Sequence, residues 1–224
     1  MKITALLPMK GNSERVPNKN LRDFNGKPLF FHVLKALNSS RYIDEIIINT
    51  DSKQISRIAL EEFSDSVIIH DRVESILGDM VSMNEIINYD LSVSKSDFYI
   101  QTHSTNPLLK TESIDKAIEK MILLHETKKN DSVFSVTKLQ TRLYTQDVQP
   151  FNHNPNELLR TQDLEPLYEE NSNFYIFSKE SFKESGGKRI GVSPYMFELD
   201  KIEAVDIDEP EDFIIAESLH KLLR

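Results

Sequence analysis

The first 70 residues alternate short apolar runs with amphipathic segments, and this alternation constrains the fold more than any other feature of the chain. Apolar runs typical of buried strands cover residues 3–7, 45–51 and 66–70, and residues 28–37 and 52–63 between them have helical spacing. Strands that alternate with helices in this way form parallel sheets with right-handed crossovers. We therefore predict an α/β fold with a mostly parallel sheet flanked by helices.

The rest of the chain extends the same pattern. We expect strands in residues 97–102, 131–137, 173–178 and 190–199 and at 205–208, and helices over 80–91, 111–128 and 211–223. The apolar positions Met80, Phe213, Ile214 and Leu219 are assigned to the core. At 224 residues the natural prediction is one domain spanning 1–224. Residues 138–170 lose clean periodicity, which is typical of a functional loop or an excursion from a compact domain.

Composition limits the class of partner and the compartment. The chain has no cysteine and a formal net charge of −9. The absence of cysteine excludes disulfides and thiolate metal sites, and together with the lack of any apparent leader it predicts a cytoplasmic protein. The acidic balance argues against nucleic acid or an anionic membrane as partner. A small anionic substrate is still compatible, because a local cationic pocket can exist in an acidic protein.

The loop after the first strand is the first candidate site. Residues 8–20 follow that strand and contain Lys10, Gly11, Arg15 and Lys19 among asparagine and serine side chains. Ligands of α/β sheets bind outside the carboxyl ends of the strands, and these residue types suit a polyphosphate. The alternative is a solvated, mildly basic loop. With a single glycine, the loop is neither a Walker A motif nor a dinucleotide fingerprint.

Residues 7–21, Leu-Pro-Met-Lys-Gly-Asn-Ser-Glu-Arg-Val-Pro-Asn-Lys-Asn-Leu, resemble the nucleotide-binding signature of the acylneuraminate cytidylyltransferase family. The family usually reads Pro-Ala-Arg-Gly-Gly-Ser-Lys-Gly-Ile-Pro-x-Lys-Asn. Here Lys10 replaces the arginine, Asn12 the second glycine and Glu14 the lysine, and Arg15 is expected to take over the duty of that lysine. The resemblance implies a Rossmann-like nucleotidyltransferase sheet. It also implies nucleotide contacts from Leu7, Met9, Gly11, Asn12, Ser13 and Asn20.

Two further segments match nucleotide-contacting positions of that family. Arg72 and Ser82 correspond to an arginine near the third strand end and a serine about ten residues later. A surface ion pair of Arg72 with Asp71, Glu74 or Asp79 is the alternative. At the end of the 97–102 strand, the resemblance adds His103, Thr105 and Asn106 to the nucleotide site. There His103 replaces a glutamine, and a purely structural histidine is the alternative.

The irregular segment carries the next match. Residues 160–171, Arg-Thr-Gln-Asp-Leu-Glu-Pro-Leu-Tyr-Glu-Glu-Asn, resemble a family motif that lies in a projecting segment, where a second subunit packs near the sugar site. The resemblance implies a homodimer. Candidate ligands of the sugar acid are Gln101, Arg160, Gln162 and Asn171, because a guanidinium is the natural partner of a carboxylate. Ser172 stands where the family has glycine. The loop at 185–191, with Lys188 and Arg189, is predicted to be either a lid or a solvated turn.

The last match is Asp206-Ile-Asp208-Glu-Pro210, before the final helix. Alternation predicts that both carboxylates face the same side at a strand end, where they repel unless a cation lies between them. Mg²⁺ takes a few carboxylates together with substrate phosphates, and the resembled family uses this motif for Mg²⁺. The alternative is a helix start with Asp208 as N-cap.

Together these matches imply a cytidylyltransferase that joins CTP to a nine-carbon 2-keto-3-deoxy acid of the sialic, legionaminic or pseudaminic type. In this reading the catalytic residues are Lys10, Arg15, Lys19 and Asp208, and the metal ligands are Asp206 and Asp208. The alternatives are a synthetase for the eight-carbon acid KDO or another sugar nucleotidyltransferase, and a non-catalytic nucleotide-sugar-binding protein.

Overall fold

The computed structural model describes residues 1–13 and 15–223, so Glu14 lies outside the described residues. Seven strands form one sheet in the order β5-β4-β1-β6-β8-β7-β9. The strands are β1 (Ile3–Leu6), β4 (Glu45–Thr50), β5 (Val67–Asp71), β6 (Phe98–Thr102), β7 (Ser132–Leu139), β8 (Leu167–Phe177) and β9 (Pro194–Glu198). Only β8 runs against its neighbours β6 and β7, and the other pairings are parallel. The predicted α/β fold with a mostly parallel sheet is confirmed.

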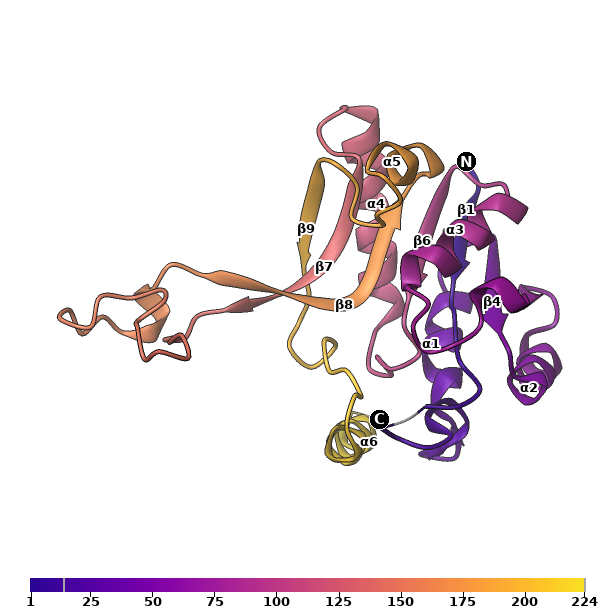
Figure 1. Ribbon diagram of the computed structural model, residues 1–224, viewed down its shortest axis with the longest axis horizontal. Coiled ribbons are helices and arrows are strands. Elements are labelled where there is room, and N and C mark those ends of the chain that lie inside the picture. Colours follow the sequence, from indigo (N-terminus) through magenta and orange to yellow (C-terminus); the bar gives the residue numbers. More distant parts are fainter. Residues whose placement is uncertain (14, 224) are drawn as a thin grey trace.

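Helices cover both faces of the sheet (Figure 1). They are α1 (Leu29–Asn38), α2 (Lys53–Phe63), α3 (Met83–Val93), α4 (Thr111–Glu126), α5 (Lys179–Glu184) and α6 (Pro210–Leu222). Successive strand residues point to opposite faces, so Ile46 and Ile48 pack in the cluster under α1, α2 and α4, while Ile47 packs with α3 and α5. A short hairpin of β2 (Asp23–Phe24) and β3 (Lys27–Pro28) precedes α1.

Three details differ from the sequence prediction. The helix expected from residue 80 begins at Met83, because Ser82 and Glu85 form a capping box, and Met80 before it is 97% exposed. Ile214, assigned to the core, is 62% exposed, whereas Phe213 and Ala216 are buried against Phe24 and Leu29. No strand forms at 205–208 in the described chain.

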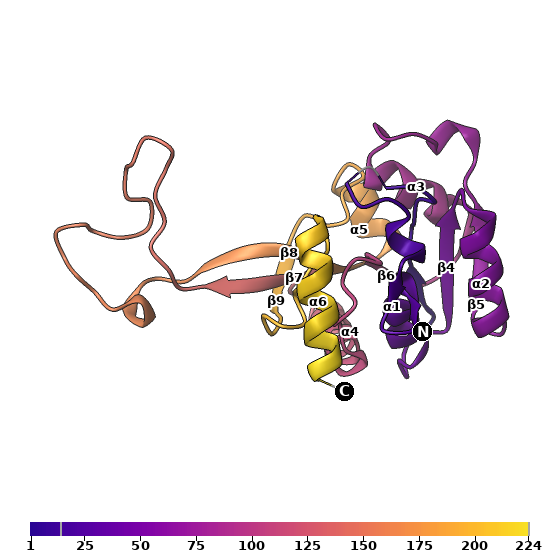
Figure 2. The ribbon, with the colours of Figure 1, turned by 90° about the horizontal axis from the view of Figure 1, so that it is seen from below.

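A two-stranded arm leaves the body of the molecule (Figures 1 and 2). Beyond a bulge at Asn171–Phe174, the pairing with β9 ends at Val136, and β7 and β8 pair only with each other from Thr137↔Glu169 to Leu139↔Leu167. Residues 140–166 form the irregular tip, which a bridge between Tyr144 and Pro150 folds back on itself. We call residues 137–169 the arm. Among the described residues, no helix is both long and apolar enough to cross a bilayer.

Candidate active site

The carboxyl ends of β1, β4, β5 and β6 meet at one edge of the sheet. The chain moves outward from β1 to β4 and β5, and then returns to place β6 on the other side of β1. The loops after β1 and β6 therefore diverge at a topological switch point, where open α/β sheets bind ligands. The predicted nucleotide loop, residues 8–20, leaves β1 at this point.

Close backbone approach fixes the nucleotide loop against its neighbours. The Gly11 amide donates to Asp51 Oδ1 at 2.6 Å, and a Cβ on Gly11 would lie 2.9 Å from the Ser52 Cβ. Asn20 Nδ2 donates to the Lys10 carbonyl at 2.8 Å, and Ser104 Oγ donates to Asn20 Oδ1 at 2.7 Å. Position 11 thus requires a glycine, because the turn between β4 and α2 leaves no room for a Cβ there. Asn20 connects the loop to the end of β6.

Leu7 and Met9 take part in this arrangement through their backbones. Both side chains are buried in the core. The Leu7 amide donates to the Ile47 carbonyl at 2.8 Å and the Met9 amide to the Asn49 carbonyl at 2.9 Å, so these residues extend the β1–β4 pairing into the loop. Their contribution to a ligand site is to hold the residues that follow.

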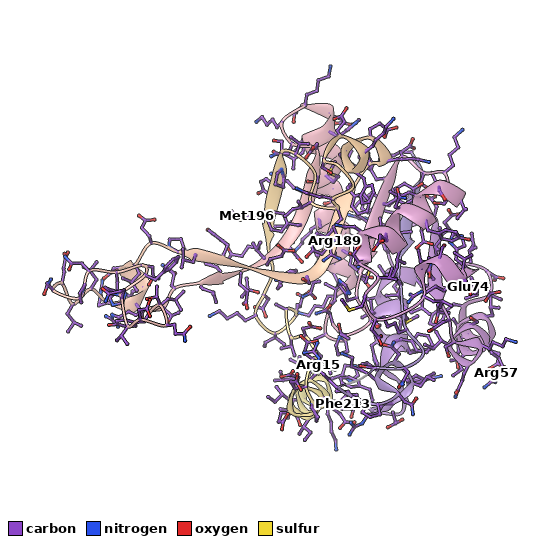
Figure 3. The ribbon with its side chains drawn as sticks, viewed as in Figure 1. Arg15, Arg57, Glu74, Arg189, Met196 and Phe213 are labelled. Atoms are coloured by element: carbon purple, nitrogen blue, oxygen red, sulfur yellow. The ribbon has the colours of Figure 1, made fainter. Side chains whose placement is uncertain are left out.

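The predicted triphosphate cations line a cavity of about 340 Å³ together with Asn12, Ser13 and Thr105. Lys10 Nζ lies 2.9 Å from Asp79 Oδ1. Arg15 Nη2 lies 2.7 Å from Asp208 Oδ1, and its Nη1 lies 3.0 Å from Glu209 Oε1. Arg15 is labelled beside α6 in Figure 3. The structure therefore brings the basic loop and the carboxyl-terminal acidic segment together across almost the full length of the chain.

Lys19 lies against the segment that carries the two aspartates. Its Nζ donates to the Ile207 carbonyl at 2.6 Å and lies 4.0 Å from Asp208 Oδ1. Burial lowers the pKa of Lys19, while the charges of Asp208 and Asp206 act to raise it. The cation that the Asp-x-Asp spacing requires is thus supplied, in this structure, by the chain itself.

The prediction of a strand at 205–208 is wrong, although the residues do alternate in burial as the sequence pattern indicated. Ile207 is fully buried against Phe24 and Phe213, and its amide donates to the Thr105 carbonyl at 3.0 Å. Asp206 and Asp208 flank it, the first partly buried and the second exposed. The alternative with Asp208 as N-cap is also wrong, because Glu209 caps α6 in a capping box with Asp212.

The donor set at this segment fits a divalent cation of the Mg²⁺ type. Burial is the main cause that raises the pKa of Asp206, and the neighbouring charge of Asp208 adds to it. Two carboxylates on one short segment, beside cations that suit phosphate, are the protein share of a typical Mg²⁺ site. The described residues contain no cluster of three or more histidine, aspartate or glutamate side chains that would hold a metal without a substrate.

Arg72 and Ser82 have structural partners. Arg72 is 8% exposed and donates from Nε to Asn49 Oδ1 at 2.9 Å and from Nη2 to the Asn49 carbonyl at 2.9 Å and the Met9 carbonyl at 3.3 Å. The alternative of a surface ion pair is therefore wrong. Arg72 holds the start of the nucleotide loop, whereas the Ser82 hydroxyl caps α3.

The end of β6 carries the remaining nucleotide candidates. Asn106 is fully buried and donates to the Val205 carbonyl at 3.5 Å. His103 Nε2 lies 3.3 Å from Nη1 of Arg189, a residue of the loop before β9. Burial, followed by the charges of Arg189 and Lys19, lowers the pKa of His103 to about 3. His103 is therefore neutral near pH 7 and accepts through Nε2. A group with so low a pKa is also a weak general base.

The predicted sugar-acid residues are not gathered in one place. Both Gln101 polar atoms are used, since Oε1 accepts from Arg189 at 2.6 Å and Nε2 donates to the Thr102 carbonyl at 2.7 Å. Asn171 is buried at the base of the arm and donates to Thr137 Oγ1 at 2.9 Å. Arg160 and Gln162 are on the arm, which projects from the body (Figure 2), and Arg160 is paired with Asp163 at 2.7 Å.

Arg189 is the site residue that the sequence prediction did not include. The only signal was the glycine-rich segment 185–191, which fitted a lid or a solvated turn equally well. In the structure Lys188 is exposed, whereas Arg189 is partly buried at the end of β6.

Comparisons with known proteins show the family of the chain. The model of the family described as cytidylyltransferase matches residues 4–223. The chain belongs to the cytidylyltransferase family. It is accordingly a nucleotidyltransferase enzyme, which decides against a non-catalytic binding protein.

Several relatives of this cytidylyltransferase carry the name of a sugar acid: pseudaminic, N,N'-diacetyllegionaminic or N-acylneuraminic acid. A pseudaminic acid cytidylyltransferase of Campylobacter jejuni is 25% identical over 237 residues, covering 99% of this chain and 97% of the relative. A CMP-N,N'-diacetyllegionaminic acid synthase of Legionella pneumophila is 28% identical over 236 residues, covering 99% and 97%. An N-acylneuraminate cytidylyltransferase of Streptococcus agalactiae is 28% identical, covering 96% of this chain and 52% of the relative.

Among solved structures, the fold resembles a CMP:2-keto-3-deoxy-manno-octonic acid synthetase complexed with CTP. The TM-score is 0.72 at 13% identity, and the match covers all of both chains. At this identity the likeness shows the fold of the cytidylyltransferase, a Rossmann-like nucleotidyltransferase sheet, as the resemblance implied.

Proposed function

We propose that this enzyme transfers a cytidylyl group from CTP to a nine-carbon 2-keto-3-deoxy sugar acid, releasing pyrophosphate. The observation that carries the proposal is the meeting of Lys10, Arg15 and Lys19 with Asp206 and Asp208 at the carboxyl edge of the sheet. The family and the named relatives support the same reaction class.

In this reaction the anomeric hydroxyl of the sugar acid attacks the α-phosphorus in line, and the bond to pyrophosphate breaks. Negative charge shifts onto the leaving pyrophosphate, so positioning and cationic stabilisation do most of the catalytic work. Lys10 and Arg15 are exposed enough to exchange their carboxylate partners for phosphate oxygens. Lys19 is held deeper, by the Ile207 carbonyl, and is assigned to the phosphates nearest the β6 loop.

The cytidine is assigned to the space beside the ends of β5 and β6. We place Arg72, Ser82, His103, Thr105 and Asn106 around it, with Gly11, Asn12, Ser13 and Asn20 along the phosphates. Because His103 is neutral, it would hydrogen bond to the nucleotide without adding charge. The catalytic base is then a group other than His103.

Mg²⁺ is the proposed metal, held by Asp206 and Asp208 together with phosphate oxygens of the substrate. When bound, it would screen the charge of the triphosphate and of the leaving pyrophosphate. Asp208 would become available to the metal when Arg15 and Lys19 exchange its carboxylate for the phosphates.

We further propose that the enzyme is a homodimer in which the arm of one copy reaches the sugar site of the other. The support is that Arg160 and Gln162 lie on an arm with exposed apolar residues, namely Tyr144, Val148, Phe151 and Leu158. Sedimentation velocity should give a species of twice the chain mass, and a purely monomeric species would contradict this part. Because CTP is a cytoplasmic nucleotide, the proposal includes a cytoplasmic location.

Pyrophosphate release tests the function. The enzyme is mixed with Mg²⁺ and each of the four nucleoside triphosphates, and with pseudaminic, legionaminic, N-acetylneuraminic and KDO acids in turn. We expect release with CTP alone and with one nine-carbon acid. Pyrophosphate release with KDO but with no nine-carbon acid would correct the substrate class. No release with any of the four acids would contradict the proposed reaction.

A further inference from the structure

Arg189 occupies an unusual position for a cation. It lies between α5 and β9, and its side chain reaches the end of β6, where Nη1 donates to Gln101 Oε1 at 2.6 Å. Its guanidinium carbon lies 3.8 Å from the centroid of the Tyr175 ring. Figure 3 labels it near the middle of the molecule, beside β8.

Among the residues that the structure describes, no acidic side chain forms an ion pair with this guanidinium. Among the described residues, no carboxylate lies within 4 Å of it, and its contacts are an amide, an imidazole and a phenol. Each of these contacts is neutral, because the pKa of His103 is lowered to about 3 and burial raises the pKa of Tyr175 to about 12. Glu170 is close enough to act on Arg189 through its charge, but its Oε1 accepts from the Tyr175 hydroxyl. A partly buried cation among neutral groups favours an anionic ligand.

The location of Arg189 relates it to the nucleotide site. The His103 ring lies 3.3 Å from Arg189 Nη1, and the charges of both Arg189 and Lys19 act on it, so Arg189 is close to the triphosphate cations. An anion held by Arg189 would therefore lie next to the nucleotide, on the side of β8. This is where a second substrate has to be placed for attack on the α-phosphorus.

The loop that carries Arg189 is built to hold its shape. Gly186, Gly187 and Gly191 all have positive φ. The Asp131 carboxylate accepts from the amides of Val192 and Ser193 at 2.8 and 2.9 Å, and a Cβ on Gly191 would lie 2.5 Å from Asp131 Oδ1. The loop is thus anchored to the start of β7, which preorganises the guanidinium.

We propose that Arg189 binds the carboxylate of the sugar acid, and that Gln101, His103 and Tyr175 orient it for this task. The inference rests on the proposed function and names the group that recognises its acidic substrate. It assigns to Arg189 the binding of the substrate carboxylate, which the sequence pattern gave to Arg160. The free guanidinium edge pairs with the carboxylate, and no covalent bond changes in this step.

Steady-state kinetics of Arg189→Met test the proposal. We expect the KM for the acid that supports turnover to rise roughly 30- to 100-fold, with the affinity for CTP changed less than about twofold. Arg189→Lys should recover part of the loss, because it keeps the charge without the planar fork. Lys188→Met, an exposed neighbour on the same loop, should behave like the wild type.

A substrate analogue separates carboxylate binding from a structural role. The wild-type enzyme should prefer the acid to its C1 carboxamide by about the same 30- to 100-fold, and Arg189→Met should lose this preference. An unchanged preference in Arg189→Met, or its loss in Arg160→Met alone, would overturn the inference.

A binding measurement on the wild type covers the cases in which the variant does not fold or no acid is turned over. The NMR signal of Arg189 Nε–H is followed while each of the four acids is added in the presence of CTP and Ca²⁺. A shift with an acid but not with its carboxamide supports the inference, and no shift with any acid overturns it. The proposed reaction fails separately, through absence of pyrophosphate release.

Discussion

The two cationic regions of the site are neutralised in opposite ways. On the nucleotide side, Lys10, Arg15 and Lys19 lie near carboxylates of Asp79, Asp208 and Glu209. On the other side Arg189 has an amide, an imidazole and a phenol around it, and among the described residues no ion-pair partner. Under the proposed function, the first region must exchange partners when a triphosphate binds, whereas the second is already arranged for an anion.

This difference follows from where the charges lie. Arg15 and Asp208 are both more than half exposed, so their ion pair contributes little to stability and is easily exchanged. Arg189 is partly buried on an anchored loop, and reorienting it would disturb Gln101 and Tyr175. A flexible, multivalent ligand such as a triphosphate suits the exchangeable region, and a single carboxylate suits the fixed one.

The largest expected effect comes from Asp208→Ala. Removing a proposed metal ligand should lower kcat by about 10³-fold or more, while the fold is kept because Ile207 still anchors the segment. The same change removes one carboxylate beside Arg15 and Lys19, although Glu209 and the Ile207 carbonyl still contact them, so CTP binding measured without Mg²⁺ should become a few-fold tighter. Isothermal calorimetry and pyrophosphate release measure the two quantities.

Glu211→Ala is the matched control for Asp208→Ala. Glu211 is an exposed acid in the first turn of α6, so this variant keeps the same net charge as Asp208→Ala. We expect its turnover to be close to that of the wild type. Normal turnover in Asp208→Ala would contradict the assignment of Asp208 as a metal ligand. Unchanged CTP affinity of this variant without Mg²⁺ would argue against exchange of ion-pair partners on the nucleotide side.

The sequence predicted the local elements on which the candidate site is built. Strand β1, the basic loop after it and the capped helix α2 depend on neighbouring residues, so periodicity and cap residues indicated them correctly. The pairing of this loop with Asp208 could be inferred only from the family resemblance. Arg15 and Asp208 are 193 residues apart, and no local pattern connects them.

The errors have physical causes of the same kind. The segment around Ile207 alternates like a strand, but Ile207 is buried by α6 and the hairpin before α1 instead of by a neighbouring strand. Arg189 was ambiguous because its partner Gln101 is 88 residues away and Tyr175 lies on another element. A lone arginine in a glycine-rich segment carries no indication of such neighbours.

A smaller effect is expected from the titration of His103, which faces Arg189. Unfolded, the ring has an ordinary pKa near 6.5, and in the folded protein the pKa is lowered to about 3. Between these values the unfolded chain binds the extra proton, so the free energy of unfolding decreases as the pH falls from about 6.5 towards 3. The slope from this group is at most about 1.4 kcal/mol per pH unit.

The variant His103→Gln should lose that slope, because an amide keeps a hydrogen-bond acceptor for Arg189 without titrating. Urea unfolding at pH 7, 6 and 5 measures the difference from the wild type. His125→Gln, the same substitution at an exposed position on α4, is the matched control. If the free energy of unfolding has the same slope against pH in His103→Gln and the wild type, Arg189 is not held beside a buried neutral ring.

The smallest effect is expected at Ser172, where the bulge of β8 supports Tyr175 and therefore Arg189. Ser172 has a φ of 56°, and its hydroxyl lies 3.1 Å from that of Tyr175. Ser172→Ala keeps the strained backbone and loses the hydrogen bond, so it should destabilise the fold by about 1 kcal/mol. Ser172→Gly also loses the bond but relieves the left-handed strain, so it should be about 1 kcal/mol more stable than Ser172→Ala.

Thermal unfolding of the two variants separates the loss of the hydrogen bond from the strain of the backbone. If both keep the wild-type preference for acid over carboxamide, Tyr175 orients Arg189 through its ring. Loss of the preference in both would show that the hydroxyl network does so.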